Sequence, residues 1–254
     1  MKQDIKSFNQ KELEEFFVSL GEKPFRARQV YQWMHVKQAA SFAEMTNISK
    51  ALQEKLRETC ELTVLRQQLV QRSRDGTAKY LFALADGNMI ESVRMKYKHG
   101  NSVCISSQAG CRMGCRFCAS ALGGLVRSLT SAELLDQIYR IQADIGERVS
   151  HVVVMGTGEP LDNYDNLLKF LELLTDEHGL HISQRNITVS TCGIVPNMRR
   201  LAEQKLQITL AVSLHASSQQ KRLELMPVAN KYELSEVLDA CRYYFEQTGR
   251  RITF

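Results

Sequence analysis

The chain lacks any apolar stretch long enough to cross a membrane. Its longest apolar runs, such as Val152–Met155 and Leu210–Val212, have the length of buried strands, whereas a membrane-spanning helix needs about 20 apolar residues. A secretory signal is also missing, because the N-terminal Met-Lys-Gln-Asp-Ile-Lys is charged and leads into a polar helix. These absences favour a soluble, cytoplasmic protein with no membrane partner.

The chain has only a small excess of charge, and it has no visible internal repeat or low-complexity segment. It contains 33 Lys and Arg residues against 28 Asp and Glu residues, which gives a formal net charge of +5. This balance permits a nucleic-acid partner but is also common in proteins that bind none. At 254 residues the chain can form one large domain, or a domain with an appendage.

Cysteine is scarce, with seven residues in the chain, but three of them lie close together. Cys111, Cys115 and Cys118 belong to the run Cys-Arg-Met-Gly-Cys-Arg-Phe-Cys. Thiolates at this spacing on a short loop can face one iron–sulfur cube, which usually takes four cysteine ligands. Three ligands leave one iron open, and an open metal position permits chemistry in addition to a structural role.

Zinc is the main alternative occupant of this loop. Zinc sites usually combine a close cysteine pair with a second pair or with histidines downstream, whereas this chain has no second pair and its next histidine is His151. A disulfide fits less well, because an odd number of cysteines in a reducing cytosol favours metal-binding or catalytic thiols. The spacing therefore favours an iron–sulfur site and leaves zinc as the alternative.

Residues 1–60 have the pattern of a helical accessory domain. Asn9 and Glu12 form a predicted capping box at the start of the first helix. A second helix is expected over Phe25–His35, and Ser49 is placed to start a third. Basic side chains of this domain can contact phosphates, although a solvated helix face is the simpler explanation for them.

Residues 61–100 change to the alternating pattern of β-strands. Asp75-Gly76 and Asp86-Gly87 each stand between strand-like runs, which is a strong short-range signal for a hairpin. We therefore expect an antiparallel β extension. A further strand around Ser102–Ser106 then leads into the cysteine loop.

Residues 101–254 alternate between short apolar strands and helices. The remaining strands are expected at 152–155, 186–190, 207–213 and 251–254, and the helices at 132–145, 164–175, 197–204 and 234–248. This alternation predicts an α/β fold in which right-handed βαβ units build a parallel sheet, wound into a full or partial barrel. Because the last strand would leave an open sheet edge, we expect the chain to be a fragment; a terminal strand that pairs at the rim of the sheet is the alternative.

Polar clusters follow the strands of the predicted sheet. Gly156-Thr157-Gly158-Glu159-Pro160 follows one strand, Ser190-Thr191-Cys192-Gly193 follows the next, and Ser213-Leu214-His215 follows a third. Each cluster has a simple structural explanation, such as a turn, a helix cap or a satisfied polar histidine. Ligands of parallel α/β folds, however, collect at the carboxyl ends of the strands. The shared placement of these clusters beside the cysteine loop therefore predicts a single site.

The open iron suggests a specific cofactor. The amino acid end of S-adenosylmethionine offers the nitrogen and oxygen donors that such an iron can take, and Glu159 can accept hydrogen bonds from an ammonium group. Together, the three cysteines and the Gly-Thr-Gly-Glu-Pro run resemble the radical S-adenosylmethionine superfamily. Five longer stretches closely resemble the RlmN family of dual-specificity RNA methyltransferases, namely Gly21–Arg26, Asn101–Gln108, Cys111–Ser120, Val154–Leu161 and Leu225–Val228.

The resemblance implies a fold, an activity and partners. It implies a helical N-terminal domain that helps to hold RNA, at 1–60, an antiparallel β extension at 61–100, and a radical SAM core, incomplete at its C-terminus, at 101–254. The implied activity is methylation of carbon 2 of adenosine in 23S rRNA and in the anticodon loop of some tRNAs. The implied cofactors are a 4Fe-4S cluster and S-adenosylmethionine. An electron-donor protein such as a flavodoxin, and a monomeric state, are expected with them.

The resemblance also assigns roles to individual residues. It makes Cys111, Cys115 and Cys118 the cluster ligands, Gly158 and Glu159 the contacts of the methionine portion of the cofactor, and Ser190, Ser213, Leu214 and His215 the rest of its pocket. Glu91 matches the position of a proton acceptor, although its residue type alone indicates an exposed strand carboxylate. Cys104 matches a thiol that forms a transient disulfide, although it otherwise has the pattern of a buried strand cysteine.

Two other functions remain open at this point. Relatives that methylate carbon 8 of the same rRNA adenosine and confer antibiotic resistance share most of these motifs. A non-catalytic, metal-stabilised RNA-binding module is the alternative from another class. In the family, a second cysteine carries the methyl group, and its expected position lies beyond residue 254. We therefore expect this segment alone to bind a cluster without methylating RNA.

Overall fold

The computed structural model describes residues 2–254. Its helices are α1 (Gln10–Ser19), α2 (Pro24–His35), α3 (Lys50–Thr59), α4 (Ser131–Ile145), α5 (Tyr164–Thr175), α6 (Val195–Glu203), α7 (Gln219–Leu225) and α8 (Leu234–Thr248). Its strands are β1 (Gln3–Asp4), β2 (Cys60–Glu61), β3 (Arg66–Arg72), β4 (Ala78–Ala83), β5 (Met89–Tyr97), β6 (Gly100–Ile105), β7 (Gln108–Gly110), β8 (Leu125–Ser128), β9 (Val149–Val154), β10 (Ile187–Thr191), β11 (Thr209–Val212) and β12 (Ile252–Thr253). No helix within residues 2–254 combines the length and the apolar character that crossing a bilayer requires.

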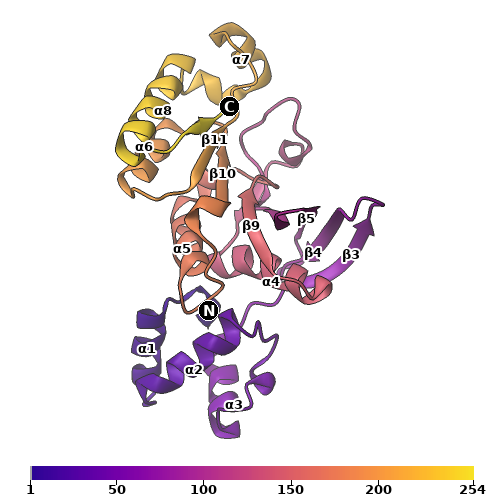
Figure 1. Ribbon diagram of the computed structural model, residues 1–254, viewed down its shortest axis with the longest axis vertical. Coiled ribbons are helices and arrows are strands. Elements are labelled where there is room, and N and C mark those ends of the chain that lie inside the picture. The colour runs from indigo at the N-terminus through magenta and orange to yellow at the C-terminus, as the bar shows by residue number, and fades with distance from the viewer. Residues whose placement is uncertain (1) are drawn as a thin grey trace.

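One large sheet organises the molecule. Its strand order is β12-β11-β10-β9-β6-β5-β4-β3. The half from β6 to β12 is parallel, whereas β3, β4, β5 and β6 pair antiparallel. Figure 1 shows α1, α2 and α3 gathered at one end of the molecule, and α6 and α8 beside the strands at the other end. The predicted α/β class with a mostly parallel sheet is confirmed, and the antiparallel strands prove to continue that sheet.

Local signals in the sequence explain most element boundaries. Asn9 and Glu12 form the predicted reciprocal capping box of α1, and the Ser49 hydroxyl accepts a hydrogen bond from Leu52 N at the start of α3. The two predicted hairpin turns carry glycines with positive φ, +87° at Gly76 and +86° at Gly87. The division into domains at residues 60 and 100 stays a prediction.

Two elements around the cysteine loop were not expected. β7 and β8 pair antiparallel and close the loop at its base. At Gly110, where φ is +76°, an added Cβ would collide with the carbonyl oxygen of Gly124. The close approach of the chain at these two positions therefore requires glycine at position 110. The helix α7 was also missed. All three elements are short, between three and seven residues, which leaves too few positions for a recognisable period.

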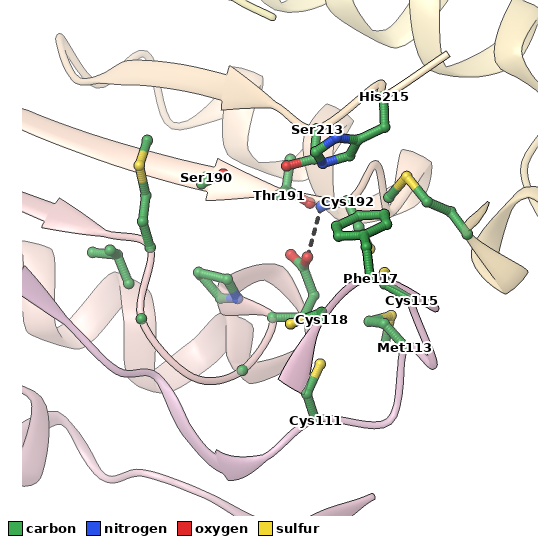
Figure 2. A pocket seen from close by; sticks show the side chains of 17 residues that line it. Cys111, Met113, Cys115, Phe117, Cys118, Ser190, Thr191, Cys192, Ser213 and His215 are labelled. Atoms are coloured by element: carbon green, nitrogen blue, oxygen red, sulfur yellow. Dashed lines mark hydrogen bonds between the residues drawn. The ribbon is translucent and has the colours of Figure 1, made fainter. Parts of the chain in front are cut away.

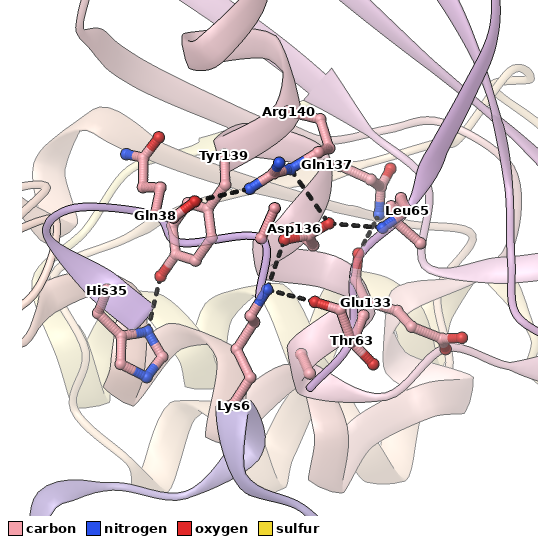
Figure 3. A network of polar contacts seen from close by, with 12 residues as sticks. Lys6, His35, Gln38, Thr63, Leu65, Glu133, Asp136, Gln137, Tyr139 and Arg140 are labelled. Carbon is pink, nitrogen blue, oxygen red and sulfur yellow. Dashed lines mark hydrogen bonds and ion pairs between the residues drawn. The ribbon is translucent and has the colours of Figure 1, made fainter. Parts of the chain in front are cut away.

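A buried polar network joins the N-terminal segment to α4 (Figure 3). The Lys6 ammonium lies 2.7 Å from Asp136 Oδ1, and both side chains are fully buried. Lys6 also donates to the carbonyl oxygen of Thr63, and Asp136 Oδ2 accepts a hydrogen bond of 2.7 Å from Leu65 N. Because each charge is paired and hydrogen-bonded, the network fixes how the first residues and the β2–β3 connection sit on α4.

His35 on α2 is fully buried beside this network and should make stability depend on pH. Its Nδ1 lies 2.7 Å from the Tyr139 hydroxyl. Burial, helped by the Lys6 charge, lowers the pKa of His35 from 6.5 to about 3. Between these two pH values the unfolded chain binds a proton that the folded chain does not. The contribution of His35 to stability is therefore complete above pH 6.5 and is lost as the pH falls below it.

A change from pH 7.5 to 5.5 should consequently lower the free energy of unfolding by about 1.4 kcal/mol through this residue alone. His35→Gln, which keeps a polar side chain but does not titrate, should remove that part of the pH dependence. Urea unfolding of both proteins at the two pH values measures the difference. Equal pH dependence in the two proteins would contradict the prediction.

Candidate cofactor site

A cavity lies where the cysteine loop meets the carboxyl ends of β9, β10 and β11 (Figure 2). The sequence-predicted residues that line it are Cys111, Cys115, Cys118, Gly158, Glu159, Ser190, Ser213 and His215. The strand ends bring these residues together across more than 100 positions of sequence, because the carboxyl ends of parallel strands meet at one edge of the sheet.

The cysteine loop directs its three thiols into this cavity. Cys111 N donates to the carbonyl oxygen of Gly124 at 2.9 Å, and Cys118 N donates to the carbonyl oxygen of Cys115 at 3.0 Å. These bonds hold the loop in a tight turn. Burial, followed by the neighbouring Cys111 and Cys118 thiols, raises the pKa of Cys115 to about 11. The neighbouring thiols raise the pKa of Cys115 because three groups that can become negatively charged face the same cavity.

The donor set is suited to an iron–sulfur cluster. Within residues 2–254, no three His, Cys, Asp or Glu side chains converge closely enough to hold one ion. In a cubane, each thiolate binds a different iron, so the sulfur atoms need to surround a common volume without meeting at one point. Three thiols around one cavity meet that requirement.

The Gly156–Pro160 loop is fastened to the chain between β6 and β7. Thr157 O accepts hydrogen bonds from Ser107 N and Gln108 N, at 2.8 and 3.1 Å. Gly158 has φ of +107°, and an added Cβ would come within 2.6 Å of Gln108 Cβ. Both the backbone conformation and this close approach therefore require glycine at position 158. The result is a backbone edge exposed to the cavity at a fixed position beside the cysteine loop.

Glu159 joins the ends of β9 and β10. Its carboxylate is buried and accepts hydrogen bonds from Leu161 N at 3.0 Å and Cys192 N at 2.7 Å; Figure 2 marks the second bond. Burial raises the pKa of the Glu159 carboxyl, and the bond from Cys192 N acts in the opposite direction. Glu159 therefore positions two loops of the cavity in addition to lining it.

The far side of the cavity is formed by β10 and β11. Ser190 and Ser213 line it, and His215 packs against Phe117 of the cysteine loop, with ring centroids 4.3 Å apart and ring planes inclined by 51°. His215 has φ of +54°, a backbone conformation that is uncommon for a residue other than glycine. Leu214, predicted as a pocket residue, is not among the lining side chains. Its carbonyl oxygen instead accepts a hydrogen bond of 3.0 Å from Arg222.

Glu91 and Cys104 lie outside the cavity but on the sheet face that runs into it. Cys104 pairs in register with Val93 and Val153, so alternation places it on the same face as Glu91 and as the cavity residue Met155. Glu91 is half exposed and its carboxylate lies 2.6 Å from the Lys79 ammonium. Cys104 is a free thiol, as are the other cysteines of the chain, and burial raises its pKa.

Sequence reasoning missed several residues at the site. Met113, Phe117, Cys192 and Met226 also line the cavity. Cys192 belongs to the strand-end cluster predicted from the sequence, but packing is the only role that the sequence indicates for it. Met226 lies in the Leu-Met-Pro-Val stretch, whose position near the cysteine loop is decided only by the tertiary fold.

Comparisons with known proteins match nearly the whole chain. Residues 3–62 match the model of the ribosomal RNA large subunit methyltransferase N-terminal domain, and residues 105–254 match the radical SAM superfamily. The chain is 66% identical over 252 residues to a probable dual-specificity RNA methyltransferase RlmN of Lachnospira eligens, covering 99% of this chain and 72% of that protein. It is 58% identical over 252 residues to a protein of the same name from Lachnoclostridium phytofermentans, covering 99% and 71%.

A solved structure agrees with these sequence matches. The crystal structure of a radical SAM methyltransferase from Sphaerobacter thermophilus superposes with a TM-score of 0.95 at 38% sequence identity. The match covers 99% of this chain and 75% of that chain. Identity of 66% over nearly the full chain, together with both domain matches, establishes the relationship. The chain belongs to the RlmN family of radical SAM methyltransferases.

Proposed function

We propose that this chain is the radical SAM part of a dual-specificity RNA methyltransferase that modifies carbon 2 of adenosine in 23S rRNA and in the anticodon loop of some tRNAs. The observation that carries the proposal is the convergence of three loop thiols with three strand ends on one cavity, in a chain that belongs to the RlmN family. A pure RNA-binding module would have no use for that convergence, so the non-catalytic alternative is not favoured.

The cavity residues fit both expected cofactors. Cys111, Cys115 and Cys118 would hold a 4Fe-4S cluster at three corners. The exposed backbone at Gly158 and the Glu159 carboxylate would receive the methionine end of S-adenosylmethionine, and the β10 and β11 ends would receive the rest. When bound, the two groups supply one-electron cleavage of a carbon–sulfur bond, which gives an adenosyl radical. The chain itself would orient the cofactor through these residues.

The sheet face beside the cavity is the proposed place of the target adenine. Glu91 and Cys104 lie on this face. In the proposed reaction Glu91 accepts a proton from the base. The Cys104 thiolate then attacks the sulfur of the second, methyl-carrying cysteine, so that a disulfide forms as the bond between that sulfur and the base-bound carbon breaks, and the released carbon takes up a proton to become the methyl group. On this face the Glu91 carboxylate lies 2.6 Å from the Lys79 ammonium.

Further parts of the proposal concern partners. The helical residues 1–60 would help to hold RNA, a flavodoxin-like protein would supply electrons, and the enzyme would act as a monomer in the cytoplasm. Methylation at carbon 8 is the alternative regiochemistry. No contact described for the cavity favours it.

Anaerobic reconstitution tests the proposal. The loaded chain should contain about four iron and four labile sulfide per chain, and dithionite should drive cleavage of S-adenosylmethionine to 5′-deoxyadenosine. A protein that holds zinc but neither iron nor sulfide would overturn it. Mass mapping of the modified adenosine in rRNA from cells expressing the gene then separates carbon 2 from carbon 8.

A further inference from the structure

Arg222 on α7 is a fully buried guanidinium behind the cofactor site. Its Nη1 donates to the carbonyl oxygens of Ser213 and Leu214, each at 3.0 Å, and its Nη2 donates to the carbonyl oxygen of Cys192 at 2.6 Å. These carbonyls belong to the segments that follow β11 and β10. One side chain therefore ties together the two strand ends that form the far side of the cavity.

The surroundings of Arg222 are shaped to admit it. Gly193 has φ of +100°, and an added Cβ would lie 3.2 Å from Arg222 Nη2. The C-terminal end of α7 also contacts the cysteine loop, since Arg116 N donates to the carbonyl oxygen of Leu225 at 2.9 Å. Met226 follows directly and lines the cavity. Arg222 thus lies on a helix that contacts both the thiol loop and the strand ends.

The positive charge of Arg222 has no carboxylate partner. Among the described residues, its hydrogen-bond partners are three carbonyl oxygens and the Met226 sulfur, and its Nε has none. Lys6, which is also fully buried, is instead paired with Asp136. A buried charge without a counter-charge is costly. Burial lowers the pKa of the guanidinium, and the ionisable groups that oppose this effect are the Cys192 and Cys115 thiols.

We propose that Arg222 is a positioning residue of the cofactor site whose buried positive charge balances the negative charge of the thiolate-bound cluster and raises its reduction potential. The inference rests on the proposed function. The physical reason is that reduction adds one electron, and therefore one negative charge, to a group next to a fixed cation in a poorly screened interior. The cation consequently stabilises the reduced state more than the oxidised state.

Three variants separate charge from structure. Arg222→Gln removes the charge but keeps a hydrogen-bond donor, and Arg222→Lys keeps the charge but loses the fork that reaches three carbonyls. Lys221→Gln is the matched control, because Lys221 is the preceding residue and is exposed, so solvent and salt screen its charge. Each protein is reconstituted anaerobically, assayed for iron, and titrated with dithionite while electron paramagnetic resonance reports the reduced cluster.

The inference predicts that Arg222→Gln lowers the equilibrium constant for one-electron reduction at least tenfold, about 59 mV. The equilibrium constants of Arg222→Lys and Lys221→Gln should stay within threefold of that of the wild-type protein. If Arg222→Gln binds no cluster, the iron content of Arg222→Lys is the test. An Arg222→Lys protein that binds the cluster supports the role of the positive charge, and one that binds none overturns it. Equal potentials for Arg222→Gln and Lys221→Gln would overturn this inference alone, whereas an unchanged protein that binds no iron would overturn the proposed function as well.

Discussion

Replacing Cys115 with alanine is expected to abolish the iron–sulfur cluster and, with it, reductive cleavage of S-adenosylmethionine. Cys115 is the middle thiol of the loop and lines the same cavity as Cys111 and Cys118. Two remaining thiols would leave two irons of a cubane without protein ligands, and cluster stability depends on cysteine ligation. Iron should fall from about four atoms per reconstituted chain to a small fraction of one. The visible absorption band of the cluster should disappear as well.

Cys241→Ala is the matched control for this experiment. Cys241 is a free thiol like Cys115, but it is buried whereas Cys115 is partly exposed, and it lies on α8 and does not line the cavity. Its replacement removes one thiol from the protein and should leave iron and sulfide content unchanged. If both variants kept the cluster, the assignment of the loop thiols as ligands would be wrong. If both lost it, the cause would be general instability, which thermal unfolding of the two metal-free proteins would reveal.

Replacing Lys6 with methionine is expected to destabilise the folded chain by about 3–5 kcal/mol, because it leaves the fully buried Asp136 carboxylate without its cation. Arg140 Nε, at 3.4 Å from Asp136 Oδ2, cannot replace the direct contact of the Lys6 ammonium. Chemical denaturation monitored by far-ultraviolet circular dichroism measures the change. A loss this large should shift the urea midpoint by about 1 M or more, since m values of small proteins are about 1–3 kcal/mol/M.

Two further variants identify the cause of that loss. Lys11→Met removes an exposed lysine whose partner Glu15 lies 3.9 Å away, and a pair of this kind contributes at most about 1 kcal/mol. The double variant Lys6→Met/Asp136→Leu removes both buried charges and should recover most of the stability. A Lys6→Met protein no less stable than Lys11→Met would refute the role of the buried pair. Failure of the double variant to recover would assign the loss to packing.

Short-range signals made much of the fold predictable from the sequence. Asn9 with Glu12, and Ser49, mark helix starts because caps act over three residues. The Asp-Gly pairs mark hairpins because their conformation is decided within the turn itself. The three cysteines mark the proposed cofactor loop for the same reason, since all three proposed ligands lie within eight residues of chain. Helix–strand alternation then placed the polar clusters at strand ends.

Other features of the site could not be found in this way. Neither the β7–β8 hairpin nor α7 has a periodic pattern long enough to recognise. Arg222 looks like one of several polar residues of a surface helix, and only the fold buries it behind the cavity. Lys6 likewise begins as part of a charged N-terminus and becomes a buried partner of Asp136.

The sequence alone determined the family resemblance, the α/β class and the cluster loop, because these depend on residues close together in the chain. The tertiary structure decided which distant residues share the cavity, which cations are buried, and that Leu214 contributes a carbonyl and not a lining side chain. Contacts such as Arg222 with Cys192, thirty positions apart, have no local signature. They exist because parallel strands bring their carboxyl ends to one edge of the sheet.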